Sequence, residues 1–173
     1  MLVIQNLTYI HPNKERLLSN ISFAVNRQEK TALTGNNGTG KSTLLKIIAR
    51  ELPLAGGQVS VEASPYYIPQ VFGQFNHLSI AQALRIEGKL HALGKILAGE
   101  VMQEYLDTLG DDWDLEERCK QALIDCQLPG YSLDRKMSSL SGGQKTKVFL
   151  AGISIHQPEL ILLDLSMPRM GGI

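Results

Sequence analysis

The sequence predicts an α/β fold with a helical insertion, and three observations lead to this prediction. Positions 1–75 are rich in short segments of β-branched and apolar residues, helical periodicity dominates positions 76–140, and helix and strand alternate again over positions 141–164. Such alternation is typical of α/β proteins with a parallel sheet. The 173 residues are enough for one domain, and the content of 43% apolar and 20% charged residues is that of a globular protein.

Charge and composition restrict the class of protein. Lys plus Arg equals Asp plus Glu, at 17 each, so net charge gives no reason to expect nucleic acid or an acidic membrane as partner. No apolar run approaches the roughly 20 residues of a membrane span, and the N-terminus does not resemble a signal peptide, so we expect a cytoplasmic location. Cys119 and Cys126 belong to no CxxC pair, and we interpret them as reduced, partly buried thiols rather than a metal or redox pair.

Strands are expected at residues 1–4, 21–25 and 30–34, which are apolar or β-branched and separated by turn-forming residues. A helix should follow Gly40, because apolar residues cluster over positions 44–49, and Pro53 lies just beyond its end. An alternating strand at residues 58–64 and a short strand within residues 66–70 complete this part.

The helical insertion begins with Ser79 and Gln82, which have the spacing of a capping box. Apolar residues continue at helical spacing as far as position 97. Gly88 and Gly94 should weaken or break this helix.

A second helix start is indicated by Asp114 with Glu117, followed by an apolar face that includes the two cysteines. A third helix should begin at Ser141, and the last strand should end at Asp164.

The strongest chemical signal is the segment GNNGTGKST at residues 35–43, which fits the phosphate-binding pattern G-x-x-x-x-G-K-[ST]. Glycines let backbone amides turn toward phosphate oxygens, and the start of the following helix adds a positive dipole end. Lys41 would reach the β- and γ-phosphates of a nucleotide, and the Ser42 hydroxyl would bind Mg²⁺. The residues expected to contact the nucleotide are Gly35, Asn36, Asn37, Gly38, Thr39, Gly40, Lys41, Ser42 and Thr43.

A second phosphate-binding device is the segment LSGGQ at residues 140–144. Ser141 can cap the helix start, and Gly142 and Gly143 leave backbone amides open toward an anion. Alone, this five-residue segment could be an ordinary helix N-terminus. It becomes specific because a phosphate loop precedes it and an apolar strand ending in Asp164 follows it.

With these motifs in this order, the chain resembles the ATP-binding cassette (ABC) ATPases from about position 2 to position 164. Residues 35–43 match Walker A, Gln70 in YIPQ matches the Q-loop glutamine, residues 140–144 match the signature motif, and LILLD at residues 160–164 matches Walker B. The resemblance implies a P-loop NTPase fold with a mixed N-terminal β-subdomain, a parallel core sheet and a helical subdomain that carries the signature. It implies one incomplete domain over residues 1–173, with segments 1–75, 76–140, 141–164 and an atypical tail, 165–173.

The resemblance also implies a mechanism that uses ATP and Mg²⁺. Two such domains face each other head to tail, in one chain or as a homodimer, so each signature motif serves the partner's nucleotide. In this chain the signature residues with that role would be Ser141, Gly142, Gly143 and Gln144.

Three further roles are carried over from the family. Asp164 would hold Mg²⁺ through water, together with Ser42 and Gln70, and Gln70 would sense the γ-phosphate; without the other motifs we would interpret Gln70 as a plain polar residue at a strand end. The position that stacks on adenine falls on His11 or Tyr9. We favour His11, with Tyr9 as a packing residue.

The branch of the family is a further prediction. The residues of the segment GNNGTGKSTLLK and of the helical insertion resemble those of the soluble ABC-F branch, which acts on the ribosome. The alternative is the cytoplasmic ATP-binding subunit of an ABC transporter, which would dock a membrane permease subunit near Gln70. The interval from Gln70 to the signature is too short for the coiled coil of a DNA-maintenance ATPase.

The family pattern breaks after Asp164. The next residue is Leu165, where the family has a glutamate that acts as general base, and no switch histidine follows. His156 precedes Asp164 and cannot be that histidine, so we interpret it as a surface residue near a helix end. We expect impaired ATP hydrolysis, poor solubility of the chain alone, and a truncated or frame-disrupted ATPase, or else a fragment of an active parent.

Overall fold

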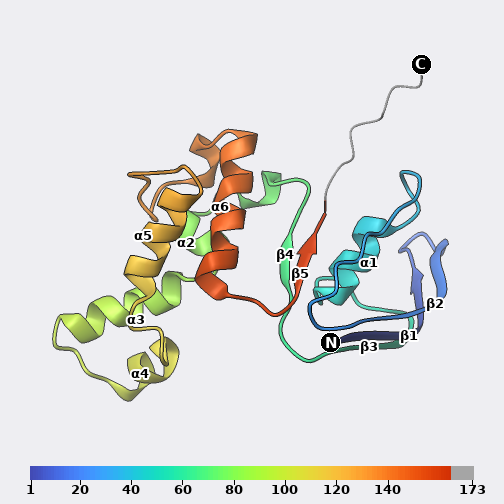
Figure 1. The fold of residues 1–173 in the computed structure, drawn as a ribbon, viewed down its shortest axis with the longest axis horizontal. Coiled ribbons are helices and arrows are strands. Elements are labelled where there is room, and N and C mark those ends of the chain that lie inside the picture. The colour runs from blue at the N-terminus through green and yellow to red at the C-terminus, as the bar shows by residue number, and fades with distance from the viewer. Residues whose placement is uncertain (165–173) are drawn as a thin grey trace. The chain divides into compact units, whose positions relative to one another are not determined.

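The computed structural model describes residues 1–164, and these residues divide into two compact units. We call the first the β unit, which contains residues 1–70 and the described residues from 158 onward. We call the second the helical unit, which contains residues 71–157 (Figure 1). None of the helices within residues 1–164 has the length and hydropathy that crossing a bilayer requires. The predicted segment boundaries at residues 75 and 140 stay predictions.

An antiparallel sheet of three strands forms one part of the β unit. Strands β1 (Leu2–Ile10), β2 (Arg16–Val25) and β3 (Gly56–Val61) lie in the order β2-β1-β3. At one end of the central strand, Leu2 pairs with Val25 of β2 and Val61 of β3. The strands predicted at residues 1–4 and 21–25 are therefore confirmed as parts of longer strands that form a hairpin.

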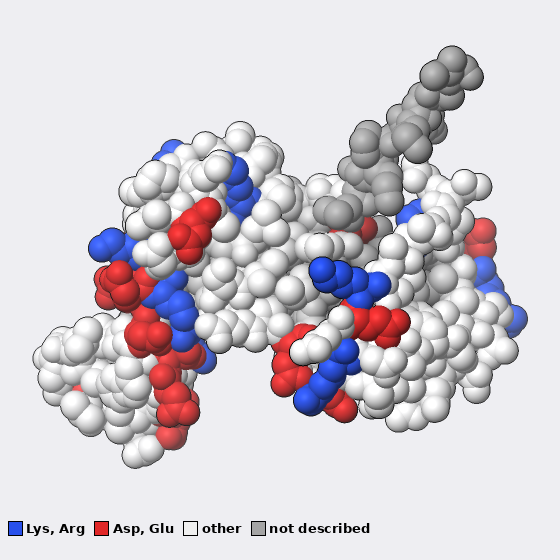
Figure 2. Space-filling model, viewed as in Figure 1, with Lys and Arg blue, Asp and Glu red and all other residues white. Residues whose placement is uncertain are grey.

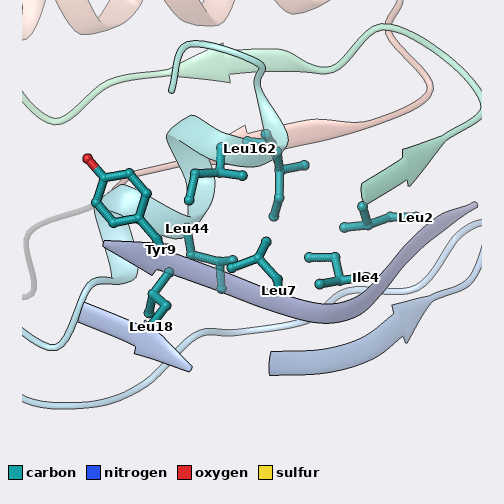
Figure 3. Close-up of a cluster of buried hydrophobic side chains, with 9 residues drawn as sticks. Leu2, Ile4, Leu7, Tyr9, Leu18, Leu44 and Leu162 are labelled. Atoms are coloured by element: carbon teal, nitrogen blue, oxygen red, sulfur yellow. The ribbon is translucent and has the colours of Figure 1, made fainter. Parts of the chain in front are cut away.

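Helix α1 (Lys41–Ile48) packs against this sheet and closes the core of the β unit. Its buried side chains Leu44, Ile47 and Ile48 join buried residues of β1 and β2 in one cluster. In Figure 3, Leu44 of α1 and Leu162 of β5 lie over the side chains of β1. This packing fixes the start of α1, and with it the loop that leads into the helix.

A parallel pair of strands forms the other sheet of the β unit. Strand β4 (Tyr66–Ile68) pairs with β5 (Ile161–Leu163), with Tyr67 opposite Leu162. The predicted parallel core is thus confirmed for these two strands. The strand predicted at residues 30–34 is wrong: this segment is exposed and belongs to neither sheet. Apolar, β-branched residues form a strand only where another strand offers hydrogen bonds and packing, and no described strand pairs with this segment.

Five α-helices are described in the helical unit, which also has two short 3₁₀ turns, Gly73–Phe75 and Met137–Ser139. The helices are α2 (Ile80–Ala83), α3 (Glu87–Leu97), α4 (Gln103–Leu109), α5 (Leu115–Asp125) and α6 (Gly142–His156).

The capping box at the start of α2 is confirmed, since Ser79 and Gln82 each accept a hydrogen bond from the other's backbone amide. The predicted helix is interrupted at Arg85, whose φ is 58°, and not at Gly88 or Gly94, which both lie inside α3. Two glycines cost the helix some stability, but tertiary packing outweighs that cost.

The second predicted cap is wrong in its chemistry. Asp114 occupies the N-cap position of α5, but its carboxylate accepts a hydrogen bond from the Arg118 guanidinium at 2.8 Å and makes no capping bond. Arg118 also pairs with Asp112, which pairs with Lys89 of α3. The hydrogen bond from Lys89, and to a lesser extent the one from Arg118, holds the pKa of Asp112 below its usual range. Figure 2 shows acidic and basic residues interleaved along this flank of the helical unit.

Candidate functional site

The phosphate loop of the β unit bends back sharply before α1 begins. Gly35, Gly38 and Gly40 have φ values of 147°, 86° and 93°. Gly40 is the N-cap residue of α1, and a Cβ there would lie 2.8 Å from Leu18 Cδ2. Both its left-handed conformation and its contact with the core therefore favour glycine at position 40.

Backbone amides at the start of α1 are available to an anion. The first intrahelical bond runs from the Leu44 amide to the Gly40 carbonyl at 2.8 Å, so the amides of Lys41, Ser42 and Thr43 precede it. No side chain caps this end, and the first turn carries no acidic residue. The positive end of the helix dipole thus lies at the loop, as the sequence pattern predicts.

Lys41 closes the loop from inside. Its ammonium group donates to the Gly35 carbonyl at 2.9 Å and to the Asn36 carbonyl at 2.8 Å. The Thr39 hydroxyl donates to the same Asn36 carbonyl at 2.9 Å. An ammonium group has three N–H donors, so these two bonds leave a third for a phosphate oxygen.

Ser42 and Asp164 lie 122 positions apart in sequence and meet directly in the structure. The Ser42 hydroxyl donates to Asp164 Oδ1 at 3.0 Å, and Asp164 is buried, with 9% of its surface exposed. A hydroxyl and a carboxylate are oxygen donors of the kind that Mg²⁺ prefers. These two residues therefore fit a Mg²⁺ ion beside the phosphate loop.

Tyr67 is a third member of this group, and the sequence analysis did not identify it. Its hydroxyl donates to Asp164 Oδ2 at 3.1 Å. Burial, and next the negative charge of Asp164, raise the pKa of Tyr67, so the hydroxyl stays protonated at neutral pH. The geometry of parallel strands could have indicated this contact. A long side chain on β4 can reach a residue two positions further along the neighbouring strand.

Gln70 lies at the same edge of the parallel pair as Asp164. It follows the end of β4, Asp164 follows the end of β5, and the Asp164 amide donates to the Ile68 carbonyl at 3.0 Å. The carboxyl ends of parallel strands meet at one edge of a sheet, where ligands of α/β proteins bind. Gln70 is exposed there, and its role toward a γ-phosphate stays a prediction.

His11 and Tyr9 differ in exposure. Tyr9 is buried in the core at 8% exposure, whereas His11 is exposed and touches Tyr9 edge to face, with ring centroids 6.4 Å apart. Of the two residues, only His11 is exposed enough for a base to stack on its ring. The choice of His11 for adenine stays a prediction.

The signature motif lies in the helical unit, where it begins α6. Ser141 and Gln144 form a complete capping box, and Gln144 Nε2 also donates to the Tyr131 hydroxyl at 2.8 Å. The predicted cap at Ser141 is confirmed. Gly142 and Gly143 are exposed, neither has a positive φ, and an added Cβ on either would meet no atom within 4 Å.

The remaining predicted residues lie apart from these groups or outside the described residues. His156 is the exposed last residue of α6, as expected, and its Nε2 donates to the Leu84 carbonyl at 2.8 Å. Cys119 and Cys126 carry free thiols, and burial raises both pKa values, that of Cys119 to about 11. Leu165 and the tail that follows it lie outside the described residues.

Several bacterial ATP-binding proteins are similar to most of this chain. It is 32% identical over 171 residues to the tylosin resistance ATP-binding protein TlrC of Streptomyces fradiae, covering 86% of this chain and 31% of that one. It is 30% identical to the energy-coupling factor transporter ATP-binding protein EcfA1 of Latilactobacillus sakei, covering 93% and 56%. It is also 30% identical to the zinc uptake system ATP-binding protein ZurA of Listeria monocytogenes, covering 93% and 62%. The chain thus spans between about a third and three fifths of these relatives.

Solved structures share the fold. An ATP-binding subunit of an ABC transporter matches with a TM-score of 0.68 and 22% identity over 94% of this chain and 65% of that one. A nucleotide-free ATP-binding cassette of an ABC transporter matches with a TM-score of 0.64 and 22% identity over 99% and 71%. At this identity the likeness shows the fold alone, which is the predicted P-loop NTPase fold of α/β class.

The family model described as "ABC transporter" matches residues 18–165, which include all four motifs. This match covers well over half of the chain. The chain therefore belongs to the ABC transporter family of ATP-binding domains.

Proposed function

We propose that this chain binds ATP with Mg²⁺ in its β unit and serves as the ATP-binding subunit of an ABC transporter. The observation that carries the binding proposal is the hydrogen bond between Ser42 and Asp164 at 3.0 Å. It joins two residues that were assigned to Mg²⁺ from separate motifs. This hydrogen bond lies at the N-terminal end of α1, where the first residue of the helix, Lys41, donates to the loop carbonyls.

Each group in the β unit would have a distinct task. The amides of the loop and the Lys41 ammonium bind phosphate oxygens, and the Ser42 hydroxyl and the Asp164 carboxylate hold the metal. Mg²⁺, when bound, neutralises phosphate charge. Gln70, at the same sheet edge, would contact the γ-phosphate, and the exposed ring of His11 would stack on adenine.

The transporter role rests on the names of the relatives. EcfA1 is named as a transporter subunit and ZurA as part of an uptake system. None of the three relatives is named for the ribosome, so their names give no support to the ABC-F prediction, in which the chain acts on ribosomes. A membrane permease subunit is therefore the proposed partner, with the chain on its cytoplasmic side.

A second ABC domain is the other proposed partner, and the signature glycines support it. Glycine forms helices less readily than alanine. Gly142 and Gly143 begin α6 without steric need for glycine in this chain, since an added Cβ would meet no atom within 4 Å. Close approach of a phosphate from outside would explain them.

Hydrolysis is proposed to be slow in this chain. Leu165, which lies outside the described residues, stands where the family has its general base, and a leucine side chain cannot accept a proton. Loss of a general base lowers a rate by about 10²- to 10⁴-fold. Steady ATP turnover that Lys41→Ala abolishes would contradict this part of the proposal.

Nucleotide binding can be tested by titrating the 173-residue chain with a fluorescent ATP analogue, in Mg²⁺ and in EDTA. We expect Lys41→Ala to weaken binding in both buffers, and Asp164→Asn to weaken it only in Mg²⁺. No saturable binding by the unmodified chain would refute the proposal.

The transporter role needs a separate experiment. The tagged chain, expressed in its host, is fractionated into membranes and ribosomes with and without ATP. Recovery with membranes is expected. Recovery with ribosomes would restore the ABC-F interpretation.

A further inference from the structure

We propose that Tyr67 is a positioning residue that fixes the carboxylate of Asp164 for Mg²⁺; this inference rests on the proposed function. The observation is that Asp164 accepts a hydrogen bond on each of its two oxygens. Ser42 donates to Oδ1 at 3.0 Å, and Tyr67 donates to Oδ2 at 3.1 Å.

The two donors hold the carboxylate from different directions. Ser42 belongs to α1, whereas Tyr67 belongs to β4, and the two approach opposite oxygens of one group. One hydrogen bond would leave the carboxylate free to turn about its Cβ–Cγ bond. Two bonds from separate elements fix its plane.

The strand pairing makes the Tyr67 contact possible. Tyr67 pairs with Leu162, so Asp164 lies two positions further along the parallel neighbour. A side chain as long as tyrosine spans such a diagonal. The ring also packs against the core of the β unit, which limits its motion.

The position of Tyr67 also links two parts of the site. It lies on the strand that leads to Gln70, while Asp164 ends the neighbouring strand. A shift of β4 would therefore move the hydroxyl that holds Asp164. Groups that orient metal ligands from behind typically contribute roughly 10- to 100-fold to metal affinity.

The test compares Tyr67→Phe with Tyr66→Phe, which removes a hydroxyl from the adjacent residue of the same strand. Successive side chains of a strand point to opposite faces, so Tyr66 does not share the path of Tyr67 to Asp164. Mg²⁺ is titrated into each chain with a saturating fluorescent ATP analogue, and binding in EDTA is measured separately. Tyr67→Phe should raise the Mg²⁺ concentration that gives half of the fluorescence change roughly tenfold, and it should leave the affinity for the ATP analogue in EDTA unchanged. Tyr66→Phe should change neither.

The outcomes separate the two proposals. If the unmodified chain binds no nucleotide, the proposed function fails. If it binds with a Mg²⁺ dependence that Tyr67→Phe leaves unchanged, or if Tyr67→Phe weakens binding equally in EDTA, the positioning role is wrong.

Two further measurements test whether Tyr67 acts through Asp164 and cover the case in which Tyr67→Phe does not fold. In an Asp164→Asn background, Tyr67→Phe should have no further effect on the Mg²⁺ titration, because the group that it positions is altered; a full additional effect would overturn the inference. If Tyr67→Phe does not fold, 3-fluorotyrosine at position 67 keeps the hydroxyl. Its ¹⁹F resonance should then shift when Mg²⁺ is added to the ATP complex, and an unmoved resonance would overturn the inference.

Discussion

Replacing Gly40 by alanine should destabilise the β unit more than replacing Gly38, although both glycines belong to the phosphate loop. Their φ values are similar, at 93° and 86°, so alanine suffers about the same conformational strain at both positions, about 1–2 kcal/mol. In both variants the loss of glycine flexibility in the unfolded chain offsets about 0.4–1 kcal/mol. What differs is the space around the new methyl group.

At position 40 the added Cβ would lie 2.8 Å from Leu18 Cδ2 and 3.2 Å from Leu17 Cγ, whereas at position 38 it would meet no atom within 4 Å. Carbon atoms pack best at about 3.5–4.0 Å. Leu18 is 7% exposed and held in the core, so its side chain has little room to move away (Figure 3). Overpacking of this kind typically costs about 1–3 kcal/mol, and we expect the two variants to differ by that amount.

The stability of each variant is measured in increasing concentrations of urea by native-state hydrogen exchange. The amides of β1 and α1 report on the β unit. The chain's single tryptophan, Trp113, lies in the helical unit, and its fluorescence serves as the control. Leu18→Ala combined with Gly40→Ala should cost less than the sum of the single variants, because the truncated side chain makes room. Equal losses in Gly40→Ala and Gly38→Ala, or strict additivity with Leu18→Ala, would refute the packing argument.

Three other predictions follow from charges and buried groups. Lys41→Ala should weaken binding of a fluorescent ATP analogue roughly 10- to 100-fold, because a charged hydrogen bond to phosphate is lost, whereas Lys46→Ala on the same helix should change affinity little. Burial raises the pKa of Cys119 to about 11, so the thiol of the unfolded chain ionises at lower pH than that of the folded chain. As the pH rises from 9 to 11, the free energy of unfolding should therefore fall by up to about 2 kcal/mol more in the unmodified chain than in Cys119→Ala. Urea melts of both chains across this pH range test the prediction. Asp112→Asn should cost the helical unit about 1 kcal/mol by tryptophan fluorescence in urea, because two cations lose their carboxylate, and Asp111→Asn should cost less.

Features set by neighbouring residues could be predicted from the sequence. The capping boxes at Ser79 and Ser141 depend on a residue three positions on, and both form. The glycine-rich loop before α1 likewise follows from its own pattern. Local hydrogen bonds and backbone preferences are sufficient in such cases.

Features that depend on distant partners could not be predicted in the same way. Residues 30–34 have the composition of a strand, but no described strand pairs with them. Asp114 is a local exception: it has the sequence of a cap, but Arg118, only four positions further on, binds its carboxylate and also pairs with Asp112. Helix α4 (Gln103–Leu109) was missed, because it depends on packing against α3 through a small cluster that includes Leu93 and Leu109.

The group around Asp164 falls between these two cases. Two motifs separately assigned Ser42 and Asp164 to Mg²⁺, and the structure brings them within hydrogen-bond distance. The structure adds that both carboxylate oxygens already accept a bond from the chain itself, the second from Tyr67. Each carboxylate oxygen has about two acceptor sites, so one remains on each for an outside donor. Mg²⁺ keeps several of its water ligands, because it dehydrates reluctantly. The Asp164 carboxylate is better suited to accept hydrogen bonds from these waters than to displace one of them. The arrangement therefore favours binding of Mg²⁺ by Asp164 through water.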